Sequence, residues 1–549
     1  LRKRNSEIDN NTEWSFNMPE MHFRVRFPNG ATVDCYSPSY VIEDYLNEGK
    51  SYPVPDFLER TRTALNIAAE RVRERYGFSC SSALDQLAAI EETVESLSPE
   101  QRAESVQVLE FKKHAPRDAR AKPVRAEHHT VIVVGGGQAG LSVSYCLKQR
   151  GIDHLVLEGR KVAHSWREER WDTFCLVTPN WQCQLPGYPY AGSDPQGFML
   201  KDEIVAYVEG YRQAFELPVR EGVTVESLTE RDTSDAGRFE LKTSQGLFTA
   251  DQVVVATGCY HKASLPDYLE QIPAPIVTLH SSKYRNPEAL PEGAVLVVGT
   301  GQSGAQIAED LHLAGRKVHL AVGPAPRCAR RYRGRDVVEW LDDLGYYDIP
   351  IEQHPNREQV RDKTNHYVTG RDGGRDIDLR KMALEGMRLY GPLTTVKGGV
   401  ATFRPELKQN LDGADAVYRS INRTIDAFIE KQNIAAPSEP DYTPPWEPES
   451  EPETLDLAAA GIRAIVFCAG FGSDFSWVKP PVLDQRGFPR HERGVTDTEG
   501  LYFIGLPWLH TWGSGRFSGV GRDAGYIVEQ ISALLSARAE EQQGLSATA

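Results

Sequence analysis

Residues 130–147 read TVIVVGGGQAGLSVSYCL, and residues 295–311 repeat the same plan as VLVVGTGQSGAQIAEDL. In both, a valine-rich run leads into Gly-x-Gly-x-x-Gly and then into a helix-like stretch. Such a turn needs one glycine for the tight bend, one that lets a pyrophosphate approach the backbone, and one for close packing of the helix on the strand. The phosphates then lie at the helix N-terminus. The sequence therefore predicts an α/β fold with two Rossmann-like dinucleotide-binding domains.

The two predicted sites differ in the residues that come after the next strand. After the first turn, HLVLEGR carries Glu158, where a carboxylate accepts hydrogen bonds from ribose hydroxyls. After the second, KVHLAV is followed by Arg327, Arg330 and Arg331, whose guanidinium groups suit a 2′-phosphate. A solvated basic surface is the alternative interpretation of these arginines. Because a flavin is the natural partner of a nicotinamide, we expect FAD at the first turn and NADPH, in preference to NADH, at the second.

Three later segments support a flavoprotein. ADQVVVATGCY (250–260) and IRAIVFCAGFGSD (462–474) look like strands that turn sharply where domains meet. GLYFIGLPW (500–508) gives a strand that stops at Gly505, and a glycine-rich loop then leads into a terminal helix. The N-terminus of that helix would place a positive dipole end against the flavin.

Composition excludes several classes of protein. A formal net charge of -15 over 549 residues argues against nucleic-acid or acidic-membrane partners, which require a basic face. No apolar run is long enough for a membrane helix and no signal peptide is recognised, so a cytoplasmic protein is expected. The 8 cysteines are too scattered for a zinc site or a disulfide framework, and no metal is expected.

The region before the first turn reads as a separate small α+β domain. A strand pair is predicted around Asn29-Gly30, and two helices follow it. No catalytic constellation is recognisable in it. The predicted order is a disordered tail (1–17), the small domain (18–112), a linker (113–128), the first part of the FAD domain (129–282), the NADPH domain with an insertion (283–460), the second part of the FAD domain (461–535) and a disordered tail (536–549). Within the insertion, the amphipathic stretch 416–432 is expected to pack as an ordinary helix, with a cover over the active site or a dimer contact as alternatives.

With SWREERWDTFCLVTPNWQCQLPG (165–187) and HSSKY (280–284) added, residues 129–535 resemble the class B flavin-dependent monooxygenases. The resemblance is greatest to the flavin-containing monooxygenase and plant auxin-synthesis-like branch. One departure is that Ala274 and Ile276 stand where the family pattern FxGxxxHxxxY has Phe and Gly. The N-terminal domain resembles nitrogen-starvation-associated proteins of nitrile-linked gene clusters.

The resemblance implies a reaction. NADPH reduces FAD, the reduced flavin captures O2 as a C4a-hydroperoxide, and one oxygen atom passes to a small nucleophilic N-, S- or carbonyl-containing substrate, in nitrogen or nitrile metabolism. It also implies that Trp166 and Arg167 contact FAD. No protein acid or base is required, so Asn180 and Arg516 are proposed only as polar groups near the reactive edge of the flavin. A plain turn residue is the alternative for Asn180.

Two rival functions stay open. A disulfide reductase shares the two-nucleotide plan, but Cys175 and Cys183 are too far apart for its CxxC or CxxxxC dithiol. An NADPH oxidase or electron-transfer flavoprotein, whose N-terminal domain docks a partner enzyme through residues 18–110, is the second rival. A homodimer is also left open. The predicted cofactor-binding residues are Gly135, Gly137, Gln138, Ala139, Gly140, Glu158, Gly159, Trp166, Arg167, Thr257, Gly258 and Gly505 for FAD, and Gly299, Gly301, Gln302, Ser303, Gly304, Arg327, Arg330 and Arg331 for NADPH.

Overall fold

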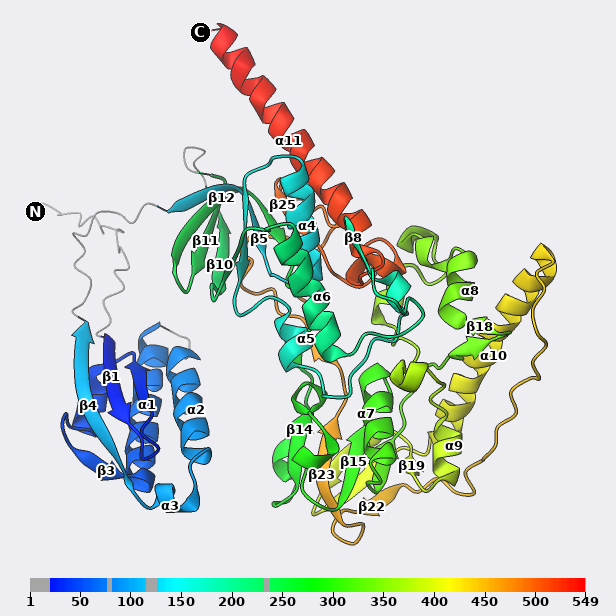
Figure 1. Cartoon of the computed structure of the whole chain (residues 1–549), viewed down its shortest axis with the longest axis horizontal. Coiled ribbons are helices and arrows are strands. Elements are labelled where there is room, and N and C mark those ends of the chain that lie inside the picture. The colour runs from blue at the N-terminus through cyan, green and yellow to red at the C-terminus, as the bar shows by residue number, and fades with distance from the viewer. Residues whose placement is uncertain (1–19, 77–80, 115–125, 232–236, 549) are drawn as a thin grey trace, which may run out of the picture. The chain divides into compact units, whose positions relative to one another are not determined.

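The computed structural model describes residues 20–76, 81–114, 126–231 and 237–548 (Figure 1). The chain divides into two compact units, residues 1–125 and 126–549. The predicted tail 1–17 lies outside the described residues, as does most of the predicted linker.

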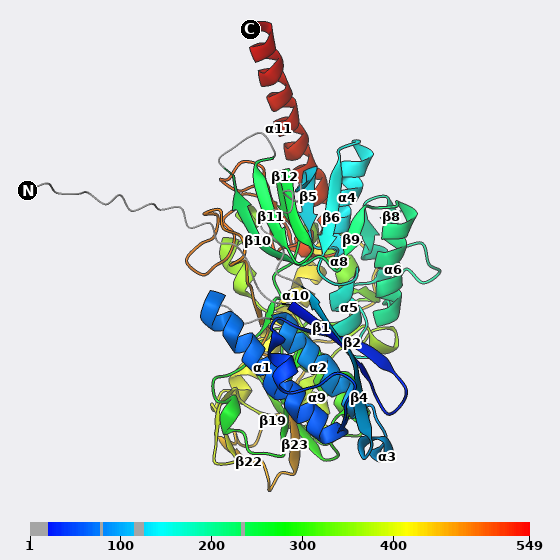
Figure 2. The same ribbon diagram turned by 90° about the vertical axis from the view of Figure 1, so that its left-hand side faces the viewer.

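The first unit is an antiparallel sheet of four strands in the order β2-β1-β4-β3, with helices α1 and α2 packed on it (Figures 1 and 2). Met21, Phe23 and Val25 alternate along β1 and are buried, because successive side chains of a strand point to opposite faces. The elements are β1 (Glu20–Arg26), β2 (Thr32–Ser37), β3 (Ser51–Pro53), α1 (Val54–Tyr76), α2 (Ser81–Glu95), α3 (Pro99–Arg102) and β4 (Ser105–His114).

The first sheet of the second unit has the order β10-β11-β12-β5-β6-β9, with β25 beside β12. The strands around the first glycine turn are parallel, and the last four residues of β5 are apolar and buried. The elements are β5 (Glu127–Val134), α4 (Gln138–Gln149), β6 (His154–Glu158), α5 (His164–Glu168), α6 (Lys201–Ala214), β9 (Val219–Glu221), β10 (Val225–Glu230), β11 (Phe239–Thr243), β12 (Gly246–Val255), β25 (Leu501–Phe503) and α11 (Val520–Thr548).

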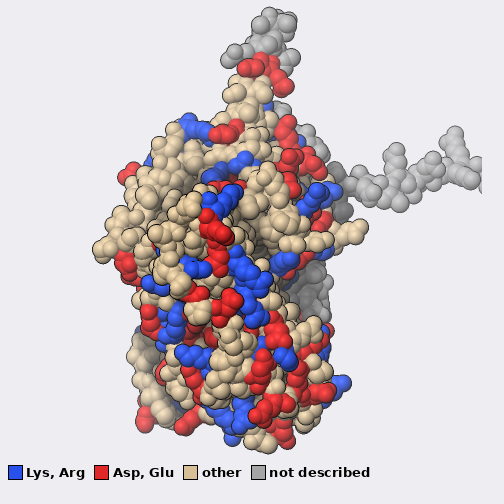
Figure 3. Space-filling model, turned by 90° about the vertical axis from the view of Figure 1, so that its right-hand side faces the viewer, with Lys and Arg blue, Asp and Glu red and all other residues tan. Residues whose placement is uncertain are grey.

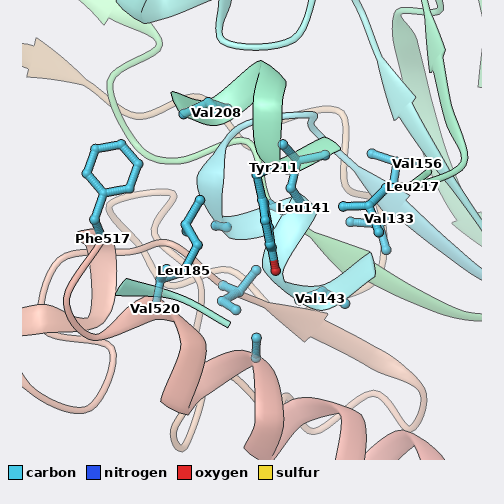
Figure 4. Close-up of a cluster of buried hydrophobic side chains, with 14 of the residues drawn as sticks. Val133, Leu141, Val143, Val156, Leu185, Val208, Tyr211, Leu217, Phe517 and Val520 are labelled. Atoms are coloured by element: carbon cyan, nitrogen blue, oxygen red, sulfur yellow. The ribbon is translucent and has the colours of Figure 1, made fainter. Parts of the chain in front are cut away.

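The core of this layer lies between the sheet and the helices (Figure 4). Leu141 from α4, Tyr211 from α6 and Val520 from α11 are fully buried and belong to one cluster with Val133 of β5 and Val156 of β6. This packing fixes α4, and with it the first glycine turn, against the sheet.

The second sheet consists of five parallel strands in the order β14-β23-β15-β16-β19. The unit β15–α7–β16 repeats β5–α4–β6. The elements are β14 (Val277–His280), β15 (Ala294–Val298), α7 (Gln302–Leu313), β16 (Val318–Ala321), β19 (Arg388–Tyr390) and β23 (Ile462–Phe467).

The insertion adds α8 (Val337–Asp343), α9 (Leu379–Leu384), α10 (Leu407–Gln432) and a small antiparallel sheet of β20 (Leu393–Lys397), β21 (Val400–Phe403) and β22 (Thr454–Asp456). The predicted amphipathic stretch 416–432 is the second half of α10, and its Ile425 is buried against Trp340 of α8. On the face of the unit shown in Figure 3, basic and acidic side chains are intermixed.

Two predicted boundaries need correction. Strands β14 and β23 both lie in the second sheet, so that domain begins before residue 283 and extends past residue 460. The segment 536–548 is not a disordered tail, because α11 continues to Thr548. In the described residues, no helix combines the length and the apolar character needed to cross a membrane.

Candidate functional site

Sterics require glycine at two positions of the first turn. Gly135 has φ +111°, and a Cβ there would lie 2.7 Å from the carbonyl oxygen of Ala256. A Cβ on Gly140 would lie 1.9 Å from the carbonyl oxygen of Gly135. In contrast, a Cβ on Gly137 would meet nothing within 4 Å, and no side chain caps α4, which begins after it. The uncapped helix N-terminus therefore faces open space, as a pyrophosphate site requires.

The second turn has nearly the same geometry. Gly299 has φ +100°, and its Cβ would lie 2.8 Å from the carbonyl oxygen of Cys468. A Cβ on Gly304 would lie 2.0 Å from the carbonyl oxygen of Gly299. Gly301 precedes α7, which has no side-chain cap, and its Cβ would only touch Thr364 at 3.5 Å.

Glu158 lies at the first turn, as predicted. Its Oε2 accepts a hydrogen bond from the backbone N–H of Gly136 at 2.7 Å, and its Oε1 accepts one from the N–H of Arg160 at 2.8 Å. A Cβ on Gly159 would lie 3.1 Å from Thr224 Oγ1. The carboxylate is thus fixed at the carboxyl end of β6, where ribose hydroxyls are bound in this fold.

Thr257 and Gly258 follow β12, directly beside Gly135. The Oγ1 atom of Thr257 is buried and has no hydrogen-bond partner among the described residues. Gly258 has φ +73°. A buried hydroxyl without a partner is costly, so this atom suits a polar ligand group.

The loop that follows β25 packs against the first turn. Gly505 has φ +78°, and a Cβ there would lie 2.8 Å from the Cβ of Ala139. Gln138 donates from Nε2 to the Gly515 carbonyl at 3.4 Å and accepts at Oε1 from Trp166 Nε1 at 3.3 Å. Trp166 in turn stacks on Phe517. The structure therefore brings together Gln138, Trp166 and Gly505, which lie far apart in the sequence.

Arg516 extends from this loop toward the insertion. Its guanidinium lies 3.8 Å from the ring centre of Trp512 and donates from Nη2 to Asn365 Oδ1 at 2.9 Å. Burial lowers the pKa of Arg516, and Tyr260, Tyr346 and Tyr347 are the groups that oppose this effect. Asn365 could not be found from the sequence, because nothing in its neighbourhood resembles a motif.

The structure does not support Asn180 as a free polar group. Its Nδ2 donates to the carbonyl of Asp194 at 3.0 Å, and its Oδ1 accepts from the N–H of Met199 at 2.7 Å. The buried amide fastens a loop, so the prediction of a role near the flavin is corrected to a structural one. Arg167 forms an ion pair with Glu209 of α6 at 2.6 Å, and its contact with FAD stays a prediction.

Two of the three predicted phosphate-binding arginines are internal. Arg327 is 2 % exposed, pairs with Asp415 at 2.8 Å and lies between the rings of Tyr418 and Tyr442. Arg330 is equally buried.

The guanidinium of Arg330 is already paired. Its Nη1 donates to the Val177 carbonyl at 2.6 Å and its Nη2 to Asp336. The expectation that Arg327 and Arg330 offer free forks to a 2′-phosphate is thus corrected, because both guanidinium groups are buried inside the fold. Arg330 is paired, whereas Nη1 and Nη2 of Arg327 have no hydrogen-bond partner among the described residues. Arg331 is exposed in the hairpin of β17 (Arg331–Tyr332) and β18 (Arg335–Asp336).

The insertion also borders the second turn. Gln302 donates from Nε2 to the Val368 carbonyl at 2.6 Å, which places segment 364–368 beside Gly301. Ser303 is half-buried in the first turn of α7. Tyr284, which matches the Tyr of the family pattern, is buried and donates to Asp310 Oδ2 at 2.7 Å. It therefore ties the segment between β14 and β15 to α7.

Thiol chemistry finds no support in the described residues. All seven described cysteines are free, and burial raises the pKa of Cys175 to about 11 and that of Cys183 to about 12. A thiol with such a pKa is not a thiolate near neutral pH. Within the described ranges, no cluster of three or more His, Cys, Asp or Glu residues could hold a metal ion.

The sequence matches known proteins over both units. Residues 22–111 match the model of the nitrogen starvation-induced protein NitG, and residues 132–378 match that of the pyridine nucleotide-disulphide oxidoreductases. An uncharacterized CzcO-like oxidoreductase of Geobacillus kaustophilus is 34% identical over 405 residues, which cover 73% of this chain and 97% of that protein. The uncharacterized oxidoreductase CzcO of Bacillus subtilis is 31% identical over 407 residues, which cover 74% of this chain and 99% of that protein.

The chain belongs to the CzcO-like family of flavin-dependent oxidoreductases. The predicted family, fold class and N-terminal NitG domain are thereby confirmed. A probable indole-3-pyruvate monooxygenase of Arabidopsis thaliana, YUCCA4, is 33% identical over 194 residues, 35% of this chain and 46% of that protein. The solved flavin-containing monooxygenase of Stenotrophomonas maltophilia shares the fold, with a TM-score of 0.50, 20% identity, and 74% and 99% of the two chains covered.

Proposed function

We propose that the chain is an FAD- and NADPH-dependent monooxygenase that transfers one oxygen atom from O2 to a small nucleophilic substrate with an N-, S- or carbonyl centre. The observation that carries this proposal is the repeated turn. In each of the two sheets, one parallel strand leads into a glycine turn, and the helix that follows has no side-chain cap at its N-terminus. Each turn contains two glycines that no other residue can replace without a clash. YUCCA4, whose name is that of a monooxygenase, supports oxygen transfer over simple electron transfer.

The residues of the first site fit FAD. Backbone N–H groups at the start of α4 would hold the pyrophosphate, and Glu158 would accept from the ribose hydroxyls. Thr257 Oγ1, buried without a partner, would bond a polar group of the same ligand. Bound FAD would supply the chemistry that accepts hydride from NADPH and activates O2.

The residues of the second site fit the diphosphate of NADPH. The start of α7 offers the same N–H groups, and no carboxylate stands at the end of β16 to repel a 2′-phosphate. With Arg327 and Arg330 internal, Arg331 is the one of the three predicted arginines that remains exposed to such a phosphate.

Arg516 and Asn365 would form the wall between the first turn and the substrate. The guanidinium is fixed by Asn365 and Trp512, and no ion pair with a carboxylate is formed by it among the described residues, so its charge is available to a bound group. A fixed cation beside the reacting atoms stabilises negative charge that develops there, and the surrounding aromatic rings exclude water. Arg516 therefore remains the proposed polar group of the reaction.

The test is oxygen labelling. FAD-loaded protein with NADPH and ¹⁸O2 is screened against amines, thioethers, thiols and oxo-acids, with product mass and hydrogen peroxide both measured. One labelled oxygen in a product, with little peroxide, supports a monooxygenase. Peroxide equal to the NADPH consumed, for every substrate class, would instead favour the oxidase or an electron-transfer role with a partner on residues 18–110.

A further inference from the structure

A basic cavity lies outside both glycine turns, although Arg167, a predicted FAD contact, lines it. It has a volume of about 430 Å³, within the usual range for small-molecule sites. The glycines of the two turns, Glu158 and Thr257 do not line it. Its lining residues are Arg160, Lys161, His164, Arg167, Glu168, Glu169, Lys283 and Arg285.

The cavity is basic although the chain as a whole is acidic. The whole protein has 77 acidic and 62 basic residues, whereas the cavity collects five Arg or Lys side chains against two Glu. Like charges gathered in one hollow repel each other, which costs folding free energy unless an anion is bound. Arg160, Lys161 and Lys283 are exposed, and the positive charge collected around the hollow attracts anions.

Most of these cations lack an acidic partner. Among the described residues, no carboxylate oxygen lies within 4.0 Å of the cationic groups of Arg160, Lys161, Lys283 or Arg285, although Glu168 and Glu169 line the same cavity. Arg285 is instead fixed by carbonyl oxygens: Nη1 donates to Ser282 and Tyr284 at 3.0 Å each, and Nη2 donates to Glu168.

The potential inside the cavity is positive. Arg160 Nη1 donates to His164 Nε2 at 2.6 Å, which requires a neutral imidazole. Burial and then the Arg160 cation lower the pKa of His164, in spite of the nearby glutamates. The imidazole thus accepts a hydrogen bond from Arg160 instead of adding a further charge.

The cavity spans the junction of the two dinucleotide domains. Arg160, Lys161 and His164 lie on or just before α5, which follows β6 of the first sheet, whereas Lys283 and Arg285 follow β14 of the second (Figure 1). The backbone N–H of Asp172 donates to the Arg285 carbonyl at 2.8 Å, so the two walls are already in contact. An anion bound between them would join the walls by further charge-assisted bonds.

We propose that this cavity binds a small multivalent oxyanion, the phosphate group of a metabolite, and that the bound anion holds the junction between the two dinucleotide domains. Positive side chains from two walls, Arg160 and Lys161 on one and Lys283 on the other, match the oxygens of a phosphate, and a compact anion fits a hollow of this size. The site is separate from oxygen transfer and does not depend on which substrate the enzyme oxidises.

The test is calorimetric titration of FAD-loaded, NADP⁺-saturated protein with inorganic pyrophosphate. Saturation with NADP⁺ blocks the start of α7, the other place where pyrophosphate could bind. We expect one binding event that weakens as NaCl is raised, and a dissociation constant at least ~10-fold higher in the double variant Lys161→Glu/Lys283→Glu. Lys397→Glu, an exposed lysine of β20, is the matched control and should leave binding unchanged.

Several results would overturn the proposal. These are an absence of binding, equal binding by the double variant, or release of FAD by pyrophosphate, which would make the cavity part of the first nucleotide site. If citrate binds as tightly as pyrophosphate, the ligand of the cavity would be a polycarboxylate and not a phosphate. Hydrogen exchange of residues 280–286 should slow when pyrophosphate binds, and unchanged exchange would contradict the role at the junction.

Discussion

The two glycine turns have almost the same backbone and differ in what stands beyond it. The distances that exclude a Cβ are 2.7 and 1.9 Å in the first turn, and 2.8 and 2.0 Å in the second. After the first, Glu158 is hydrogen-bonded to the turn, whereas β16 ends without an acid and the arginines after it lie mostly inside the fold. We therefore expect the turn to provide phosphate binding and the neighbouring elements to decide which dinucleotide is bound.

The largest expected effect comes from adding a Cβ at the last glycine of either turn, where the backbone leaves no space for it. Gly140→Ala and Gly304→Ala each force a side-chain carbon into a backbone carbonyl, so each should lose at least about 3 kcal/mol of folding free energy or fail to accumulate. Urea unfolding of the apoproteins measures this loss. The control Gly137→Ala meets open space and should lose less than about 1 kcal/mol. Equal stability of all three would show that the turns are looser than the structure has them.

The next effect separates the internal arginine from the exposed one. Arg327→Ala leaves Asp415 with only Arg380 and removes a cation from between two tyrosine rings, so it should cost about 3 kcal/mol of folding free energy. Arg331→Ala should leave the unfolding midpoint unchanged and raise the KM for NADPH, but not for NADH, by up to ~10-fold. A preference for NADPH that survives Arg331→Ala would place the 2′-phosphate elsewhere.

The acid of the first site should act on one cofactor only. Glu158→Gln keeps the side-chain shape but weakens acceptance from ribose hydroxyls, and we expect FAD affinity to fall about 10-fold. Fluorescence titration of apoprotein with FAD measures it. The NADP⁺ affinity of the FAD-loaded variant should not change. Loss of both affinities would mean that Glu158 supports the fold and not the ligand.

A pH-dependent effect concerns α11, the helix that packs against α4. Asp523, in the first turn of α11, is 2 % exposed, and burial raises its pKa to about 6. Because this value lies above that of an unfolded aspartate, about 4, its contribution to stability is complete below pH 4 and is lost as pH rises through 6. Asp523→Asn should therefore be more stable than the wild type by roughly 2–3 kcal/mol at pH 7 and equal to it near pH 4. A difference that is constant with pH would contradict a raised pKa.

Local patterns predicted the turns well. The glycine spacing, the strands before them and the place of Glu158 follow from sterics within about 30 residues, which the sequence records directly. The same holds for Gly505, which lies against Ala139, because a strand end followed by a glycine-rich loop is a local signal.

Long-range pairing is what the sequence did not reveal. Arg327 looked like a phosphate ligand because its partner Asp415 lies 88 positions further along the chain. Asn180 looked free because its bonds go to Asp194 and Met199, in a loop with no motif. Apolar strands such as β14 and β23 do not record which sheet they join, so the domain boundaries were misplaced.

The most direct test of the division between the turns is anaerobic mixing of FAD-loaded Gly301→Ala with NADPH, followed by flavin absorbance. A Cβ on Gly301 touches only Thr364, so the variant should fold and retain FAD, while the methyl group blocks approach of a pyrophosphate to α7. We predict a full complement of FAD and reduction at least ~10-fold slower at subsaturating NADPH, restored in part by higher NADPH. Unchanged reduction, or loss of FAD in place of loss of NADPH binding, would contradict the assignment of FAD to the first turn and NADPH to the second.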